Sequence, residues 1–281
     1  MNYREIRATG PTAAFVDRFW VLNDEAGEAG LVQRVLPDGS AELVFNLDQP
    51  FESLQQGKWR SQPTCFLAGQ ITGSLLLRST GRCRVLGVRF LPQGAGRLFG
   101  LPMEETANSL LPIADLSPAL ARGLDEARGA ATLAGQFAWI QSALNQCERI
   151  HGRRDTLVDE AVRYIGAASG AVDLSSLAGH LGISLRHLER RFRNAVGLTP
   201  KVFSRIRRFQ RVFQVVERET TAWVQVAMEC GYYDQAHLIR DFQEFAGKAP
   251  AALLAGTDLA EHFLHRHGVS QFSKTSAGRT L

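Results

Sequence analysis

Cysteine is scarce in this sequence, with four residues among 281, and no two of them stand in a C-x-x-C pair. This spacing excludes a zinc ribbon, an iron–sulfur site and a disulfide-dense secreted scaffold, and it fits a reducing compartment. No stretch approaches the about 18 uninterrupted apolar residues that a membrane-spanning helix needs. Residues 1–10 also lack the apolar segment of a signal peptide. We therefore expect a cytoplasmic protein with no membrane partner.

Histidine is missing from residues 1–150, because all seven histidines lie at or beyond His151. This absence weakens any histidine-based metal or acid–base chemistry in the first half. The segment Gly94–Gly100 fits neither G-x-G-x-x-G nor a P-loop, so we expect a loop before a helix there. No G-x-S-x-G nucleophile motif occurs either. We expect no catalytic residue, no metal and no cofactor, and therefore no enzyme.

Two weaker patterns contain possible metal or catalytic side chains. Cys147 and His151 lie one helical turn apart, but no third partner is evident. His262, His265 and His267 form an H-x-x-H-x-H pattern near the end of the chain. We expect a helix position for the first pair and a solvated tail for the second group.

Positive charge is concentrated in one part of the chain. Residues 1–150 hold 14 Lys and Arg against 15 Asp and Glu, whereas residues 151–281 hold 18 against 13. Within Arg186–Arg211 there are nine basic residues and one acidic residue, Glu189. Such a segment indicates a polyanion partner, most commonly nucleic acid. The alternative is a solvated helix face.

The C-terminal half repeats itself with a period near fifty residues. Arg186–Phe192 (RHLERRF) matches Ala236–Phe242 (AHLIRDF) at an offset of 50. The same offset aligns two G-x-x-P segments, and an offset of 49 aligns an upstream alanine and glycine of each copy: Gly197 with Gly247, Pro200 with Pro250, Ala178 with Ala227, and Gly182 with Gly231. The second copy therefore has one extra residue in its turn, and the repeat indicates two copies of one structural unit.

Each copy has the pattern of a helix–turn–helix unit. In the first copy, Asp173 and Ser184 are placed to cap two successive helices, and Gly197 is placed to end the second. In the second copy, the supporting helix contains Trp223, Val226 and Ala227, and Asp234 caps the next helix. Apolar residues at helical spacing over 200–217 predict a rigid connecting helix between the copies.

These units resemble the C-terminal DNA-binding region of AraC/XylS-type transcription regulators, over about residues 156–254. The similarity is carried by Gly231-Tyr-Tyr-Asp-Gln-Ala-His-Leu-Ile-Arg-Asp-Phe242 and by Gly247-Lys-Ala-Pro250. Glu229, Cys230, Tyr232 and Tyr233 depart from the family pattern, which changes packing detail only. The resemblance implies a sequence-specific regulator of transcription, activator or repressor, with double-stranded DNA as its partner.

The first half predicts an antiparallel barrel or sandwich. Apolar runs at 32–36 and 42–47 flank the turn Pro37-Asp38-Gly39-Ser40, and further runs lie at 65–67, 74–77 and 85–91. Helical patterns follow, first with Leu116, Leu120 and Leu124 and then with Leu133, Phe137, Ile140 and Leu144. The second set either packs on its own sheet or forms a dimer interface. Leu36-Pro-Asp-Gly39 and Val88-Arg-Phe-Leu-Pro92 resemble the sensor domain of a subset of the AraC family.

The fold class we expect is thus α+β, with an N-terminal β barrel or sandwich followed by trailing helices and an all-α double helix–turn–helix domain. We expect an effector-sensing or dimerisation domain over 1–150, a DNA-binding domain over 151–255 and a partly disordered tail over 256–281. The partners we expect besides DNA are a small-molecule effector, a second copy of the chain and RNA polymerase. The sequence assigns no effector-binding residue.

The second helix of each unit would enter a major groove and read base edges with residues near its start. The predicted base-reading residues face away from the apolar stripe: Arg186, Glu189, Arg190, Gln235, Ile239 and Arg240. The predicted phosphate contacts are mostly basic: Arg191, Arg193, Lys201, Arg205, Arg207, Arg208, Lys248, His187 and His237. For the two histidines, a packed structural role is the alternative.

Two other interpretations stay open. In the first interpretation, the first half is a dimerisation domain that binds no effector. In the second, it is an enzyme domain that the C-terminal half tethers to DNA. Binding of small metabolites to the chain argues against the first, and turnover by residues 1–150 would support the second.

Overall fold

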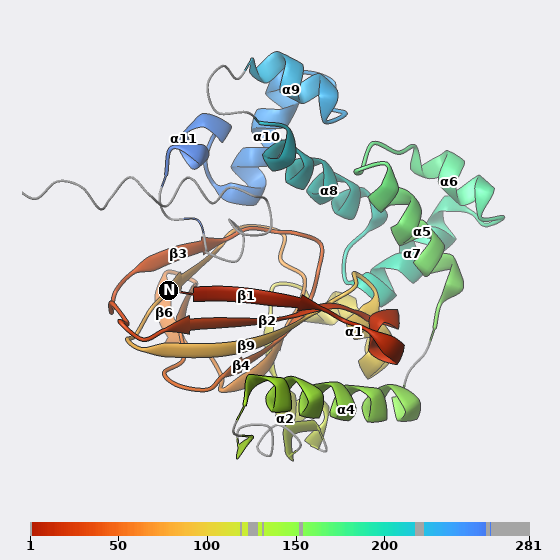
Figure 1. Cartoon of the computed structure of the whole chain (residues 1–281). Helices are drawn as coiled ribbons and strands as arrows, with labels where there is room; N and C mark the ends of the chain where they lie inside the picture. Colours follow the sequence, from red (N-terminus) through yellow and green to blue (C-terminus); the bar gives the residue numbers. More distant parts are fainter. Residues whose placement is uncertain are drawn as a thin grey trace, which may run out of the picture.

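The chain combines an N-terminal region of two β-sheets with a C-terminal helical domain (Figure 1), which confirms the predicted fold class. The structure is a computed structural model, and it describes residues 2–118, 120–122, 129–130, 132–151, 154–216, 222–256 and 259. Below, "sheet region" means the described residues up to 151, and "helical domain" means residues 154–256. None of the described helices is long and apolar enough to cross a membrane.

Both sheets are antiparallel throughout and pack as a sandwich. The larger sheet has the order β1 (Asn2–Arg7), β2 (Val16–Asp24), β9 (Cys83–Phe90), β4 (Glu42–Asn46), β7 (Cys65–Ala68) and β10 (Leu110–Pro112). The smaller sheet has the order β3 (Val32–Val35), β8 (Leu75–Arg78), β5 (Glu52–Gln55) and β6 (Lys58–Ser61). The expected turn at residues 37–40 crosses from β3 in the smaller sheet to β4 in the larger one.

Several short helices complete the sheet region. These are two 3₁₀ turns, η1 (Gly10–Ala14) and η2 (Met103–Thr106), and the helices α1 (Gly94–Phe99) and α2 (Ile113–Leu116). The glycine-rich segment that we expected to be a loop is α1 itself, and that expectation was wrong. A methyl group at Gly96 would lie 2.3 Å from the Ala195 carbonyl oxygen. The glycine is therefore needed for close approach of two helices and not for loop flexibility.

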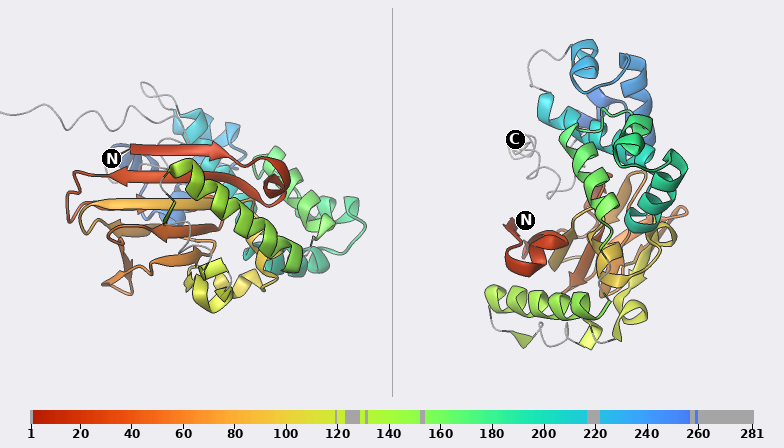
Figure 2. Two further views of the ribbon diagram at one scale, coloured as in Figure 1. Left: turned by 60° about the horizontal axis from the view of Figure 1, so that its bottom comes forward. Right: turned by 90° about the vertical axis from the view of Figure 1, so that its right-hand side faces the viewer.

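Helix α4 (Leu133–His151) packs on its own sheet. Phe137, Ile140 and Leu144 are buried with the apolar face of the larger sheet, and the Phe137 ring centroid lies 5.6 Å from that of Phe19. Of the two alternatives for this apolar stripe, the structure therefore shows packing within the chain. Figure 2 shows α4 lying across the strands of the larger sheet.

The helical domain contains both predicted helix–turn–helix units. Its helices are α5 (Thr156–Ala167), α6 (Leu174–His180), α7 (Leu185–Val196), α8 (Pro200–Val215), α9 (Trp223–Glu229), α10 (Gln235–Ala246) and α11 (Pro250–Leu254). The connecting helix α8 ends at Val215, and Glu217 lies outside the described residues. The predicted tail also lies outside them, apart from Gly256 and Leu259, and so do its three histidines.

The sheet region contributes to the core of the helical domain. Leu36, at the end of β3, is 2% exposed and packs in one apolar cluster with residues of α5 to α11. Gly39 has φ +82°, and a methyl group there would lie 2.7 Å from Phe203 Cε2 of α8. The turn after β3 therefore inserts against α8, which ties the two parts of the chain together.

Replacing Leu36 with Ala should lower the free energy of unfolding by about 2–5 kcal/mol, because it leaves a cavity in the helical domain. The loss should also reduce hydrogen-exchange protection of α8 amides, although residue 36 lies in the sheet region. Leu31→Ala is the matched control, since Leu31 is 45% exposed. Unchanged protection of α8 in Leu36→Ala would show that the helical domain is stable without this insertion.

Candidate nucleic-acid interface

Hydrogen bonds at the ends of its helices define the first helix–turn–helix unit. The Asp173 side chain accepts from the amides of Ser175 and Ser176 at the start of α6. The Ser184 hydroxyl accepts from the His187 amide at the start of α7. Helix α7 ends at Gly197, whose φ is +89°. The predicted caps are thus confirmed, and they fix where α7 begins.

Helix α7 exposes one polar stripe along its length. Arg186, Glu189, Arg190 and Arg193 are exposed at spacings of three and four residues, whereas Leu188 and Phe192 on the other side are fully buried. Neither Arg186 nor Arg190 forms an ion pair within the described part of the chain. Both guanidinium groups are therefore available to an external partner.

A groove of about 970 Å³ runs along this stripe. Its wall is mainly α7, and it includes Ser184, Arg186 and Arg190. Two carboxylates from outside α7 also line it. They are Asp155, the N-cap of α5, and Glu104 of the 3₁₀ turn η2 in the sheet region. The groove thus combines a basic helix face with acidic groups at its border.

The second unit presents the equivalent stripe on α10. The Asp234 side chain accepts from the His237 amide, 2.6 Å away, and so caps the helix. Arg240 is exposed and forms no ion pair within the described residues, while Gln235 and Ile239 are half-buried. Ala236 and Gln243 are also exposed on this stripe, and the sequence analysis did not predict them as part of it. The offset of 50 could have found them, since they are equivalent to Arg186 and Arg193.

Arg205, a predicted phosphate contact, instead joins α8 to α10. Its Nη2 atom lies 2.7 Å from Asp241 Oδ1, and it also pairs with Glu244. Its guanidinium carbon stands 5.0 Å from the Phe245 ring centroid. The hydrogen bond to Glu244, and to a smaller extent the one to Asp241, raises the pKa of Arg205 above its ordinary value. Since Asp241 is 1% exposed, Arg205 neutralises a buried carboxylate, and we do not retain it as a phosphate contact.

Arg207 and Arg208 also point into the protein. Burial lowers the pKa of Arg207, although the charges of Asp38 and Asp17 in the sheet region oppose that shift. Arg208 donates to the Gly231 carbonyl oxygen at 3.3 Å and lies 5.2 Å from the Tyr232 ring centroid. Arg208 therefore holds the turn of the second unit against α8, and neither residue is retained as a phosphate contact.

The remaining predicted phosphate contacts lie nearer the surface. Arg191 pairs with Asp155 at 2.8 Å, and Arg193 pairs with Glu104 at 2.7 Å. Lys201 is exposed. His187, His237 and Lys248 are half-buried, and the His237 ring packs edge-on against Tyr232 at 5.2 Å. Phosphate contact by this group stays a prediction.

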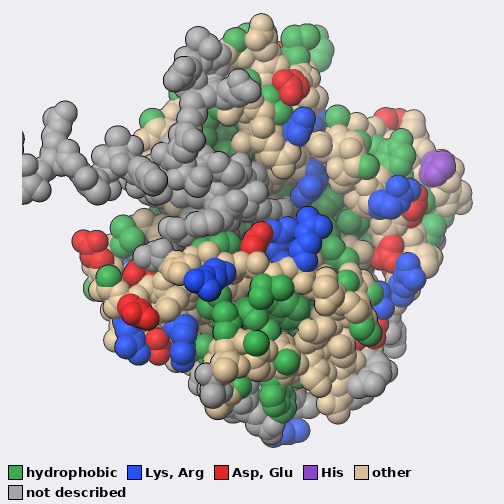
Figure 3. Space-filling view, in the orientation of Figure 1, with side chains coloured by type: hydrophobic (Ala, Val, Ile, Leu, Met, Phe, Trp, Pro, Cys, Tyr) green, Lys and Arg blue, Asp and Glu red, His purple; other side chains and the backbone are tan. Residues whose placement is uncertain are grey.

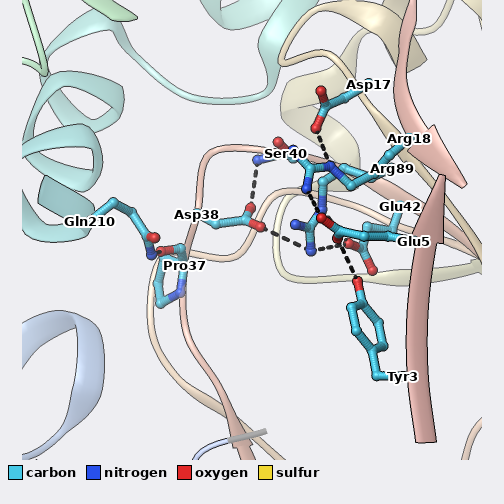
Figure 4. A network of polar contacts seen from close by, with 10 residues as sticks. All are labelled: Tyr3, Glu5, Asp17, Arg18, Pro37, Asp38, Ser40, Glu42, Arg89 and Gln210. Carbon is cyan, nitrogen blue, oxygen red and sulfur yellow. Dashed lines mark hydrogen bonds and ion pairs between the residues drawn. The ribbon is translucent and has the colours of Figure 1, made fainter. Parts of the chain in front are cut away.

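A buried charge network holds the turn that touches α8 (Figure 4). Arg89 on β9 is 1% exposed and pairs with Glu42 at 2.5 Å and with Asp38 at 3.3 Å. Although burial alone would lower it, Glu42 and Asp38 raise the pKa of Arg89 above its ordinary value. Asp38 also accepts from the Ser40 amide, and the Pro37 carbonyl accepts from Gln210 Nε2 of α8. The turn is therefore fixed on both sides.

Basic side chains also gather near the middle of the face in Figure 3, where the helical layer meets the sheets. Nothing in the described residues there suggests a metal, since no group of three or more His, Cys, Asp and Glu side chains could hold one. Cys147 is buried, and burial raises the pKa of its thiol, so the thiolate needed for nucleophilic chemistry is disfavoured. The side chain of His151 lies outside the described residues.

Replacing Glu104 with Gln should strengthen DNA binding several-fold. The change frees Arg193 for a phosphate, which should steepen the slope of log K against log salt by about 0.9. The measurement is a salt titration of DNA affinity. Glu105→Gln is the control, because it removes the same charge from the neighbouring exposed position and should leave the slope unchanged. Equal slopes for all three proteins would mean that the Arg193–Glu104 pair does not compete with DNA.

Two family models match the chain. Residues 4–112 match a domain of unknown function (DUF6597), and residues 177–256 match a helix–turn–helix domain. No curated protein sequence matches the chain.

Three solved structures to which the chain is similar are two structures of ToxT and one of CuxR. ToxT from Vibrio cholerae is 11% identical with a TM-score of 0.42, over 90% of this chain and 98% of that one. ToxT bound to an unsaturated fatty acid, from Vibrio cholerae strain SCE256, is 12% identical with a TM-score of 0.44, over 86% and 96%. The AraC-like transcriptional activator CuxR is 17% identical with a TM-score of 0.26, over 75% and 86%.

The helix–turn–helix match covers most of both repeated units, from α6 to just beyond α11. It agrees with the caps, the turns and the exposed basic stripe described above. Residues 177–256 therefore form a helix–turn–helix domain, and its two units are the repeated units described above.

Proposed function

We propose that the chain regulates transcription by reading two successive major-groove patches of one DNA site, one with α7 and one with α10. The observation that carries this proposal is the repeated exposure of unpaired arginines on the two helices. Arg190 and Arg240 occupy equivalent repeat positions, are both exposed, and have no ion-pair partner among the described residues. Intramolecular partners occupy most of the other arginines of this segment.

The side chains on each stripe suit different bases. Arg186, Arg190 and Arg240 suit guanine, whose N7 and O6 atoms accept two hydrogen bonds from one guanidinium. Glu189 can accept from the cytosine amino group, and Gln235 can pair with adenine. Ile239 replaces Glu189 in the second unit and suits a thymine methyl group. The two helices should therefore prefer different base sequences.

Contacts to phosphate come from a smaller set than the sequence indicated. Lys201 lies exposed in the first turn of α8, whose N-cap Thr199 lines the groove. Arg191 and Arg193 can exchange Asp155 and Glu104 for phosphate, and His187, His237 and Lys248 lie near the helix starts or the α10–α11 turn. These contacts set the position of the protein on DNA and its affinity, not the sequence that it prefers.

The proposal extends to the sheet region, for which we propose a regulatory and not a catalytic role. Its turn at residues 37–40 contacts α8, and α1 and η2 contact α7. A small molecule that changes the conformation of the sheet region can therefore act directly on α7 and on α8. A second copy of the chain and RNA polymerase are further proposed partners, and the cytoplasm is the proposed location. An activity found by a turnover screen of the full chain would contradict the non-catalytic role.

Replacing Arg190 or Arg240 with Ala should each relax base preference at one patch only, and cost about 1–3 kcal/mol of binding free energy on the preferred site. The measurement is selection of bound sequences from a random pool for each variant. The two affected patches should lie about 10 base pairs apart, since two helices on one face of DNA are separated by one turn.

Lys201→Ala is the control for these variants, because loss of a phosphate contact should weaken all sequences about equally. If Arg190→Ala and Arg240→Ala both leave the selected sequence unchanged, or both relax the same patch, the two helices do not read DNA separately.

A further inference from the structure

A second cavity, of about 300 Å³, lies between the start of α4 and the larger sheet. On the sheet side it is lined by Arg4 of β1, Asn23 of β2 and Arg84 of β9, with Val21 between them. On the other side it is lined by Thr132, Leu133 and Gln136. The cavity belongs to the sheet region alone and is separate from the groove along α7.

Strand register brings the two arginines to the same face. Arg4 pairs with Val21, and Asn23 pairs with Arg84, while residues two apart on a strand share a face. The same face bears Phe19, which packs against Phe137 of α4. Arg4 and Arg84 stand on either side of β2, so their backbones are roughly 10 Å apart across the strands. Side chains of this length can converge on one group between them.

Among the described residues that line this cavity, the charged side chains are both arginines. Neither Arg4 nor Arg84 forms an ion pair within the described residues. No Asp or Glu is among the described residues that line the cavity. Asn23, which lines the cavity, donates from Nδ2 to Glu25 Oε1 at 3.5 Å. An anion is therefore the favoured occupant.

The start of α4 adds hydrogen-bond donors. Helix α4 is 19 residues long, and its first turn contains no acidic residue. The Thr132 hydroxyl accepts from the Gly135 amide at 3.1 Å, which leaves other amides of the first turn directed at the cavity end of the helix. Gln136 is 6% exposed and lines the cavity. Its side-chain amide can both donate a hydrogen bond to a ligand in the cavity and accept one from it.

We propose that this cavity binds a small organic anion. Its acid group would lie between Arg4 and Arg84, and its body would lie against Val21 and Leu133 within reach of the Gln136 amide. Carboxylate and phosphate groups share the chemistry that two guanidinium groups recognise. The volume suits a metabolite and not a polymer.

Helix α4 links the cavity to the DNA-binding face. Near the other end of α4, Glu148 pairs with Arg97 of α1 at 2.6 Å, and α1 packs against α7 at Gly96 and Ala195. An anion bound at the first turn of α4 is thus connected to α7 through two helices. The role of this anion as an effector rests on the proposed function, whereas its binding does not.

The test is calorimetric titration of the full chain, without DNA, with benzoate, succinate and inorganic phosphate at millimolar concentration and constant ionic strength. At least one probe should bind with a stoichiometry of one, and Arg4→Gln and Arg84→Gln should each weaken it tenfold or more. Gln136→Leu should weaken the same probe while keeping the packing of α4. A preference for the carboxylates or for phosphate identifies the acid group.

Arg60→Gln is the matched control, because Arg60 is exposed on β6 and does not line the cavity. Its affinity for the probe should equal that of the unchanged chain. Absence of binding by all three probes overturns the proposal, and so does equal weakening by Arg60→Gln and Arg84→Gln. DNA affinity, measured separately, distinguishes the two proposals: a chain that binds the anion but no DNA refutes the proposed function and leaves this site standing.

Discussion

The insertion of the turn at residues 36–40 against α8 is the contact on which the rest of the structure depends. Leu36 fills the core of the helical domain, Gly39 allows Phe203 to approach, and Gln210 donates to the Pro37 carbonyl. Arg89 holds the turn from the sheet side through Asp38. Because α8 connects the two helix–turn–helix units, whatever fixes α8 to the sheet region also fixes both units relative to it.

The charges of the helical domain divide between structure and recognition. Three arginines of α8 have partners within the protein. Arg205 pairs with Asp241, and Arg207 lies near the charges of Asp38 and Asp17 in the sheet region. Arg208 donates to the Gly231 carbonyl oxygen in the turn of the second unit. Arg186, Arg190 and Arg240 face outward on α7 and α10. The acidic groups Glu104 and Asp155 line the groove along α7 and pair with Arg193 and Arg191. Through Glu104, the sheet region therefore contributes directly to the electrostatics of this groove.

Local signals in the sequence predicted the helical domain well. Asp173, Ser184 and Asp234 cap helices where expected, because a cap is decided by a side chain and the amides two or three residues later. The role of Arg205 was not predictable in this way, since its partner Asp241 is 36 residues away and is positioned by tertiary packing. The same limit applies to Leu36, whose apolar pattern indicates burial but not in which core. In α1, the glycines indicated a loop, although close packing against α7 requires Gly96.

The central claim is that α8 holds α7 and α10 at a fixed separation that matches one turn of DNA. Hydroxyl-radical footprinting of the full chain on its selected site tests this claim most directly. The account predicts two protected patches on one face of the duplex, about 10 base pairs apart, with the same separation on every strong site. A single protected patch, or two patches whose separation varies from site to site, would contradict it.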